Sequence, residues 1–184
     1  MNSDDPLAYF ITWTVYGTHL QGDERGWRRR GRGHQPPQPQ LEQWHRTRLK
    51  QAIVLLNPDQ RTVVETECQR HCDHRGWRLW AVNARTNHVH AVVTAVGYSG
   101  ATVRDQLKAN GTRGLREQGK VFRDRPVWSV GGDWECINNE EDLETVCLYV
   151  REAQDRMQFK TRTGASAQRL MFAVQHGIRK AGPR

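Results

Sequence analysis

The hairpin-like stretch between residues 77 and 95 limits the possible folds most strongly. Residues 77–84 and 88–95 are rich in β-branched, aromatic and small side chains, and residues 85–87 form a short turn between them. Strands joined by so short a connection pair antiparallel, because a parallel pair needs a crossover of a dozen or more residues. The stretch therefore predicts two neighbouring strands of a mainly antiparallel sheet.

The second of these strands carries His88 and His90. Residues two apart in a strand point to the same face, so the two imidazoles project side by side. Neutral imidazole is a common ligand of divalent metal ions, and the pair would supply half of a metal site. The alternative is that both histidines are ordinary strand residues, and the pair alone does not decide between the two interpretations.

The rest of the chain alternates between strand and helix patterns. Asn57 is a suitable N-cap for a helix that begins at Pro58, and Gly76 ends that helix. The other expected elements are a strand over 8–16, helices over 41–56, 99–118 (interrupted near Gly111) and 140–159, and short strands over 127–130 and 134–137. This order predicts an α+β fold, a small mainly antiparallel sheet with packed helices in a split β-α-β arrangement of ferredoxin or RRM type.

A chain of 184 residues is expected to form one main domain, over residues 1–160. Residues 17–40, rich in Gly, Pro, Gln and Arg, are expected to form a basic loop that a partner would order. Residues 161–184 are basic and weakly patterned, and we expect them to form a C-terminal tail.

The charge balance favours a polyanionic partner. The chain has 28 Lys and Arg against 20 Asp and Glu, a formal net charge of +8, and it contains seven Trp. Arginine planes and indole rings stack on unpaired bases, so single-stranded nucleic acid is the first candidate. The alternative for each Trp is a place in the core. The candidate DNA-binding residues are Arg25, Trp27, Arg28, Arg29, Arg30, Arg32 and Trp128, with Trp44 and Trp134 as further candidates for stacking.

The cysteines predict no disulfide framework. Cys68 and Cys72, with His71 and His74 nearby, resemble a zinc knuckle, but no second ligand pair follows at a usual spacing. We therefore interpret them as incidental residues near a helix end. The first residues lack the apolar segment of a signal peptide, and no run approaches membrane-spanning length, so a cytoplasmic protein with reduced thiols and no membrane partner is expected.

The last helix carries three further candidates. Helical phase places Tyr149 at the boundary between the buried and exposed faces, where its hydroxyl could reach a cleft or its ring could simply cover the core edge. Gln154 falls near the middle of the apolar stripe, and a buried carboxamide needs a partner, which could be the backbone or a metal ion. Glu152 is a rival metal ligand that points towards solvent.

Taken in this order, these residues resemble the HUH single-tyrosine transposases, and more narrowly their REP-associated branch. The resemblance rests on His88-Val89-His90 after Asn87 and on Tyr149 in an amphipathic helix near a Gln. The resemblance covers roughly residues 8–157. Four further stretches support it: residues 14–27, 76–82, 128–133 and 149–154.

The resemblance implies cleavage of single-stranded DNA beside hairpins or palindromic repeats. Tyr149 would be the nucleophile that forms a 5′-phosphotyrosine link, and His88 and His90 would hold Mg²⁺ or Mn²⁺ with a third ligand. The protein would act as a monomer or a homodimer. In many relatives the third ligand, an Asn or Gln, lies four residues beyond the tyrosine, where this chain has Ala153. Gln154 follows one residue later, about 140° around a regular helix from Tyr149. Either the tyrosine approaches from the flank, or the helix is irregular here, or Glu152 is the ligand.

Two other functions are compatible with the sequence. One is a single-stranded nucleic-acid-binding module of RRM type that has lost its nuclease chemistry, with His88 and His90 as binding residues. The other is a metal hydrolase that uses activated water, with Tyr149 in a structural role. A hydrolase would leave no covalent adduct.

Overall fold

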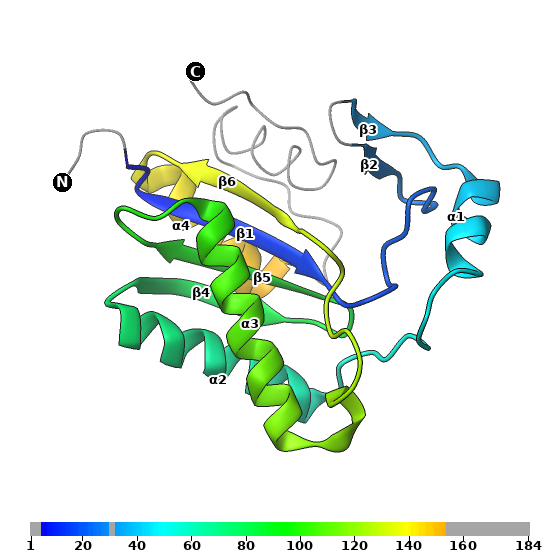
Figure 1. The fold of residues 1–184 in the computed structure, drawn as a ribbon. Helices are drawn as coiled ribbons and strands as arrows, with labels where there is room; N and C mark the ends of the chain where they lie inside the picture. The colour runs from blue at the N-terminus through cyan, green and yellow to red at the C-terminus, as the bar shows by residue number, and fades with distance from the viewer. Residues whose placement is uncertain (1–4, 30–31, 154–184) are drawn as a thin grey trace.

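A four-stranded antiparallel sheet forms the centre of the molecule (Figure 1). The structure, a computed structural model, describes residues 5–29 and 32–153. The strand order is β4-β5-β1-β6, and all neighbours pair antiparallel. The strands are β1 (Ala8–Thr14), β4 (Arg78–Ala84), β5 (His88–Thr94) and β6 (Asp133–Ile137).

The connections between these strands confirm the predicted fold class. Helix α2 (Pro58–Arg75) links β1 to β4, and helix α3 (Gly100–Gln118) links β5 to β6. The sheet strands and their two connecting helices thus follow the order β-α-β-β-α-β, which is the ferredoxin-like arrangement. The fold is α+β, as the sequence predicts.

The two faces of the sheet carry different layers. Helices α2 and α3 cover one face, and the main core lies between them and the sheet. On the other face, helix α4 (Glu140–Leu148) packs Leu143, Val146 and Cys147 on a smaller cluster that includes Phe10 and Val92. The second helical layer covers only part of its face, which leaves polar strand residues beside it.

The predicted α2 boundaries are confirmed by its caps. The Asn57 side chain accepts a hydrogen bond from the Gln60 backbone N–H, and the Gln60 side chain accepts one from the Asn57 N–H. At the other end Gly76 adopts a left-handed conformation with φ 66°, which suits glycine. Cys68 and Cys72 are buried in the main core, in agreement with their interpretation as incidental helix residues.

The first helix is shorter than predicted. Helix α1 spans Pro39–Arg46, whereas the sequence predicts a helix over 41–56. Backbone groups beyond it bond to distant parts of the chain: the Lys50 N–H donates to the Tyr16 hydroxyl, and the Leu56 N–H donates to the Thr86 carbonyl. These tertiary bonds replace the helical ones.

The segment expected to be a loop over 17–40 contains regular structure. Strands β2 (Trp27–Arg29) and β3 (Gly33–Gln35) form a two-stranded ribbon, and α1 begins within the segment. Within it, Asp23 accepts hydrogen bonds from the backbone and the guanidinium of Arg25. The prediction of a loop is therefore wrong for the residues of β2, β3 and the start of α1.

The predicted interruption of α3 at Gly111 is also wrong, because the helix is continuous. A single glycine costs a helix only about 1 kcal/mol relative to alanine, so it does not break a helix that packs on its neighbours. A Cβ at Gly111 would lie 3.5 Å from the Trp128 ring and 3.6 Å from Val64, both ordinary contacts.

The strand predicted over 127–130 reduces to one isolated bridge between Val15 and Trp128. The final helix also departs from prediction, because α4 ends at Leu148 and a π-helical turn spans Tyr149–Ala153. Its expected end near residue 159 and the tail over 161–184 lie outside the described residues. Within the described part of the chain, no helix is both long and apolar enough to cross a membrane.

Candidate active site

A row of polar residues crosses the sheet beside α4. The strand register aligns Asn83 on β4, His90 on β5, Thr12 on β1 and Asp133 on β6. Directly opposite residues of antiparallel strands point to the same side, so all four share one face. This is the face of Phe10, two residues before Thr12, and therefore the face that α4 only partly covers.

His90 is held tightly within this row. It is 6% exposed, its ring is stacked on Phe10 at a centroid distance of 5.3 Å, and its Nδ1 lies 2.9 Å from the Thr12 hydroxyl. Burial, followed by the nearby His88 and Arg85, holds the pKa of His90 well below its usual value. The imidazole is therefore neutral at pH 7, the form that binds metal ions, and its Nε2 is the nitrogen that Thr12 does not engage.

His88 lies next to His90 at the start of β5. The two rings are 4.7 Å apart between centroids, with an interplanar angle of 75°. The His88 Nδ1 is 2.7 Å from the side-chain oxygen of Asn87, which can only accept, so Nδ1 carries the proton. In this tautomer the lone pair is on Nε2. A side-chain acceptor on the other ring nitrogen is common among metal-binding histidines.

Tyr149 completes the cluster from the opposite layer. Its ring lies 5.9 Å from the His90 ring and 6.3 Å from the Phe10 ring, both in edge-on geometry. The residue is half-buried, at the boundary position that helical phase predicts. Burial raises the pKa of the Tyr149 phenol, so the hydroxyl is protonated in the absence of a compensating positive charge.

Strand β4 anchors the turn that carries Tyr149. The Asn83 side-chain N–H donates to the Val150 carbonyl at 3.0 Å, and the Arg151 guanidinium donates to the Trp80 carbonyl at 2.6 Å. The β4–β5 register shifts between Leu79 and Ala81, which leaves Trp80 as the extra residue of a bulge.

Asn83 is not among the site residues predicted from the sequence. Counting back from the predicted turn over 85–87 places it opposite Val89, whereas the turn in the structure is one residue shorter and places it opposite His90. A polar residue opposite a predicted metal ligand, in an otherwise apolar strand, is a candidate for the site.

The candidate third ligands are only partly described. Glu152 lies in the π-helical turn and is exposed, as its phase predicts. Gln154 lies outside the described residues. The turn itself is the local helix irregularity that was one of the three explanations for the unusual spacing after Tyr149.

The His88–His90 pair has the donor chemistry of a metal site, with two neighbouring imidazoles whose Nδ1 atoms are already engaged. Among residues 5–29 and 32–153, no group of three or more His, Cys, Asp and Glu side chains gathers in a way that could hold an ion. The described residues therefore place two imidazole donors side by side.

The structure buries two of the aromatic candidates for DNA binding. Trp27 is 5% exposed and its indole N–H donates to the Pro36 carbonyl. Trp128 is 8% exposed and its indole N–H donates to the Lys108 carbonyl of α3. Both rings pack in the interior, so neither presents a face on which a base could stack.

The arginine candidates for DNA binding all lie between residues 25 and 32, far from His88 and His90 in the sequence. The Arg25 guanidinium makes two hydrogen bonds of 2.7 Å to the Asp23 carboxylate, and Arg32 is exposed after the β2 strand. Arg28 and Arg29 belong to β2, while Arg30 lies outside the described residues.

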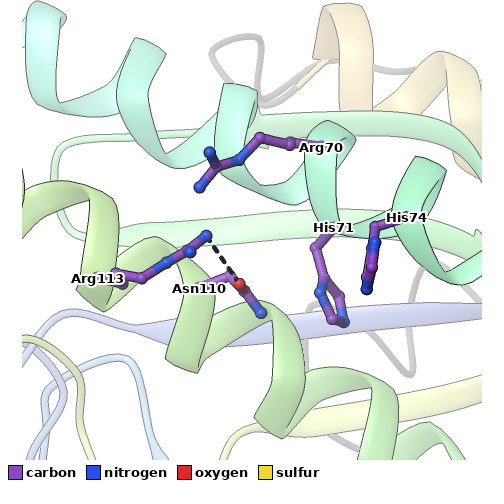
Figure 2. Close-up of a pocket in the computed structure, with 5 residues that line it drawn as sticks. All are labelled: Arg70, His71, His74, Asn110 and Arg113. Carbon is purple, nitrogen blue, oxygen red and sulfur yellow. Dashed lines mark hydrogen bonds between the residues drawn. The ribbon is translucent and has the colours of Figure 1, made fainter.

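A separate hollow of about 460 Å³ lies between α2 and α3, which cover the other face of the sheet (Figure 2). The buried Glu67 carboxylate accepts hydrogen bonds from Arg70 at 2.6 Å and from Arg113 at 2.8 Å. This network ties the two helices together. The lining consists of Arg70, His71, His74, Asn110 and Arg113, none of them a predicted catalytic or DNA-binding residue.

No protein-family model matches the chain, and no curated protein is similar to it at a significant level. Two solved structures similar to it are transposases. One, from Deinococcus radiodurans R1, has a TM-score of 0.44 and 10% identity, covering 82% of this chain and 92% of its own. The other, a REP-associated tyrosine transposase bound to a REP hairpin, has a TM-score of 0.42 and 11% identity, covering 78% of this chain and 63% of its own.

Proposed function

We propose that this protein cleaves and rejoins single-stranded DNA next to hairpins or palindromic repeats, as a metal-dependent transposase-like enzyme with Tyr149 as its nucleophile. The observation that carries the proposal is the contact between the Tyr149 and His90 rings, 5.9 Å apart, with His88 beside them. A phenol from the helical layer and two imidazoles from the sheet meet beside the row of polar residues that crosses the sheet.

His88 and His90 are the residues that would hold the divalent ion, Mg²⁺ or Mn²⁺, through their Nε2 atoms. When bound, the ion supplies positive charge that polarises the scissile phosphate and offsets the charge that develops on it. Mg²⁺ prefers oxygen ligands, so a site with two imidazoles indicates that Mn²⁺ would also serve. Asn87 and Thr12 orient the two rings through hydrogen bonds to their Nδ1 atoms.

Tyr149 would carry the covalent step. Its phenolic oxygen attacks the phosphorus, the bond from phosphorus to the 3′ oxygen breaks, and the phosphate stays on the 5′ side as a phosphotyrosine. The phenol loses its proton and the departing 3′ oxygen gains one, so the products are a tyrosyl phosphodiester and a free 3′-OH. The phosphodiester is conserved in the link, so rejoining needs no nucleotide cofactor.

Gln154 remains our proposed third ligand, with Glu152 as the alternative. The π-helical turn over Tyr149–Ala153 departs from regular α-helical geometry, so the spacing of four residues expected for a regular helix does not apply here. Comparing the metal affinity of Gln154→Ala with that of Glu152→Ala separates the two, and we expect the larger loss in Gln154→Ala.

The test incubates the full chain with end-labelled single-stranded DNA containing a hairpin, with Mg²⁺ or Mn²⁺ and with a chelator. We expect cleavage only with metal, and its loss in His88→Ala and His90→Ala while the hairpin still binds. His74→Ala, an exposed histidine of α2, is the matched control and should cleave normally. Binding without any cleavage would instead indicate a binding module, and cleavage by folded His88→Ala and His90→Ala variants would contradict the metal assignment.

A further inference from the structure

Tryptophan exposure singles out one residue of the chain. Trp13, Trp27, Trp77 and Trp128 are each at most 8% exposed, and Trp80 and Trp134 are partly buried against the two cores. Trp44 is 50% exposed. It is the tryptophan whose ring the fold leaves accessible.

Packing does not explain Trp44. Helix α1, which carries it, has no buried residue. The Arg48 guanidinium lies over the indole at 3.7 Å from the ring centroid, and its Nη1 donates to the Trp44 carbonyl at 3.2 Å, which fixes the guanidinium in place. The His45 ring contacts the indole edge-on at 4.8 Å. The result is a surface indole with a cation held against it.

The position of α1 connects Trp44 to the candidate active site. We call residues 15–57, which link β1 to α2, the arm. Both ends of the arm bond to the turn that precedes His88: the Val15 N–H donates to the Asn87 carbonyl and the Leu56 N–H to the Thr86 carbonyl, each at 2.8 Å. Figure 1 shows the arm extending from the end of β1, beside the sheet. The arm is therefore attached to the sheet at the end where His88 begins β5.

The charge around Trp44 suits a polyanion. Arg46, Arg48 and Lys50 follow it within six residues, and Glu42, the nearest acid, is paired with Arg46. Cations reach phosphates, and an indole can stack on any unpaired base, which together favour single-stranded DNA over an acidic protein surface.

We propose that Trp44, backed by Arg48, is a stacking site for an unpaired base of single-stranded DNA that flanks the cleavage point. The proposal rests on the proposed function for the identity of the DNA, and it adds a binding site on the arm that discriminates unpaired from paired DNA. A duplex offers no free base face to Trp44, so the contribution belongs to the single-stranded flank alone.

The test measures binding without chemistry, using the full chain in a chelator and two fluorescent DNA hairpins. One hairpin is blunt and the other carries an unpaired flank. We expect Trp44→Leu to weaken binding of the flanked hairpin roughly ten-fold or more, with Trp44→Phe between it and the wild type, because aromatic stacking is lost or reduced. Binding of the blunt hairpin should be unchanged. Leu55→Ala, an exposed apolar residue of the same arm, is the matched control and should bind both hairpins normally.

Equal binding of the flanked hairpin by wild type and Trp44→Leu would overturn the proposal, as would an equal loss for both hairpins. Because α1 buries no side chain, we expect the variant to fold, and circular dichroism checks this. Arg48→Ala provides a second variant, with a smaller loss confined to the flanked hairpin. Failure of the proposed function is distinguishable, since a chain that never cleaves can still show the Trp44 dependence in this assay.

Discussion

The side-chain amide of Asn83 donates a 3.0 Å hydrogen bond to the main-chain carbonyl of Val150, the residue after Tyr149. Asn83 is also the β4 residue directly opposite His90. One side chain thus ties the turn that carries the proposed nucleophile to the strand next to the proposed metal ligands. Together with the bond from Arg151 to the Trp80 carbonyl, it fixes the spacing between the two layers.

This bond predicts that Asn83 is a positioning residue. In Asn83→Ala the Val150 carbonyl loses this donor, and the π-helical turn can shift relative to His90. We expect kcat for DNA cleavage to fall about ten-fold or more, because small misplacements of a reacting group are costly. KM for DNA and the metal concentration for half-maximal activity should stay unchanged, because the histidines and the arm are intact.

Asn138→Ala is the matched control for this variant, since Asn138 is an exposed asparagine outside the strands and helices. It should retain full activity. A change in KM or in metal affinity for Asn83→Ala, with kcat intact, would contradict a positioning role and indicate direct binding instead.

Alanine substitutions at two glycines of α3 are expected to have different effects on stability. A Cβ at Gly111 meets only ordinary contacts, so Gly111→Ala should leave the free energy of unfolding unchanged or raise it by up to about 1 kcal/mol, as alanine favours helix. A Cβ at Gly114 would lie 2.6 Å from Glu67 Cγ and 3.0 Å from Val63. Gly114→Ala should therefore lower the free energy by about 1–3 kcal/mol.

Urea unfolding followed by circular dichroism measures both glycine variants. Each variant serves as the control for the other, because both place an alanine in α3. Strong destabilisation by Gly111→Ala together with a harmless Gly114→Ala would contradict the described packing of α2 on α3.

The thiols predict a simple labelling pattern. Cys136 is exposed, whereas Cys68, Cys72 and Cys147 are buried, and burial raises the pKa of the Cys72 thiol to about 12. Thiolate is the reactive form. At pH 8 a thiol-specific reagent should label Cys136 rapidly and the other three only after unfolding. Cys136→Ser should remove the fast phase, and rapid labelling of Cys68 or Cys72 would contradict the main core.

Much of the fold follows from local sequence signals. The turn over 85–87 and the caps Asn57 and Gly76 predict β4, β5 and α2, because these boundaries depend on residues close in the chain. The His88–His90 pair follows from strand periodicity alone.

Features that depend on distant contacts could not be predicted in this way. The end of α1 depends on backbone bonds to Tyr16 and Thr86, and the burial of Trp128 depends on the Lys108 carbonyl of α3. The anchoring of the π-helical turn likewise depends on Asn83, far from Tyr149 in sequence. Local propensity carries no information about such partners.

The most direct test of the account is a search for the covalent product on Tyr149. The protein is incubated with labelled single-stranded hairpin DNA and Mn²⁺, then resolved by denaturing electrophoresis, and the adduct is digested and mapped by mass spectrometry. We predict a protein–DNA adduct with the 5′-phosphate on Tyr149, absent from Tyr149→Phe and present in Tyr16→Phe as a control. Cleavage that persists in Tyr149→Phe, or an adduct on another residue, would contradict the account.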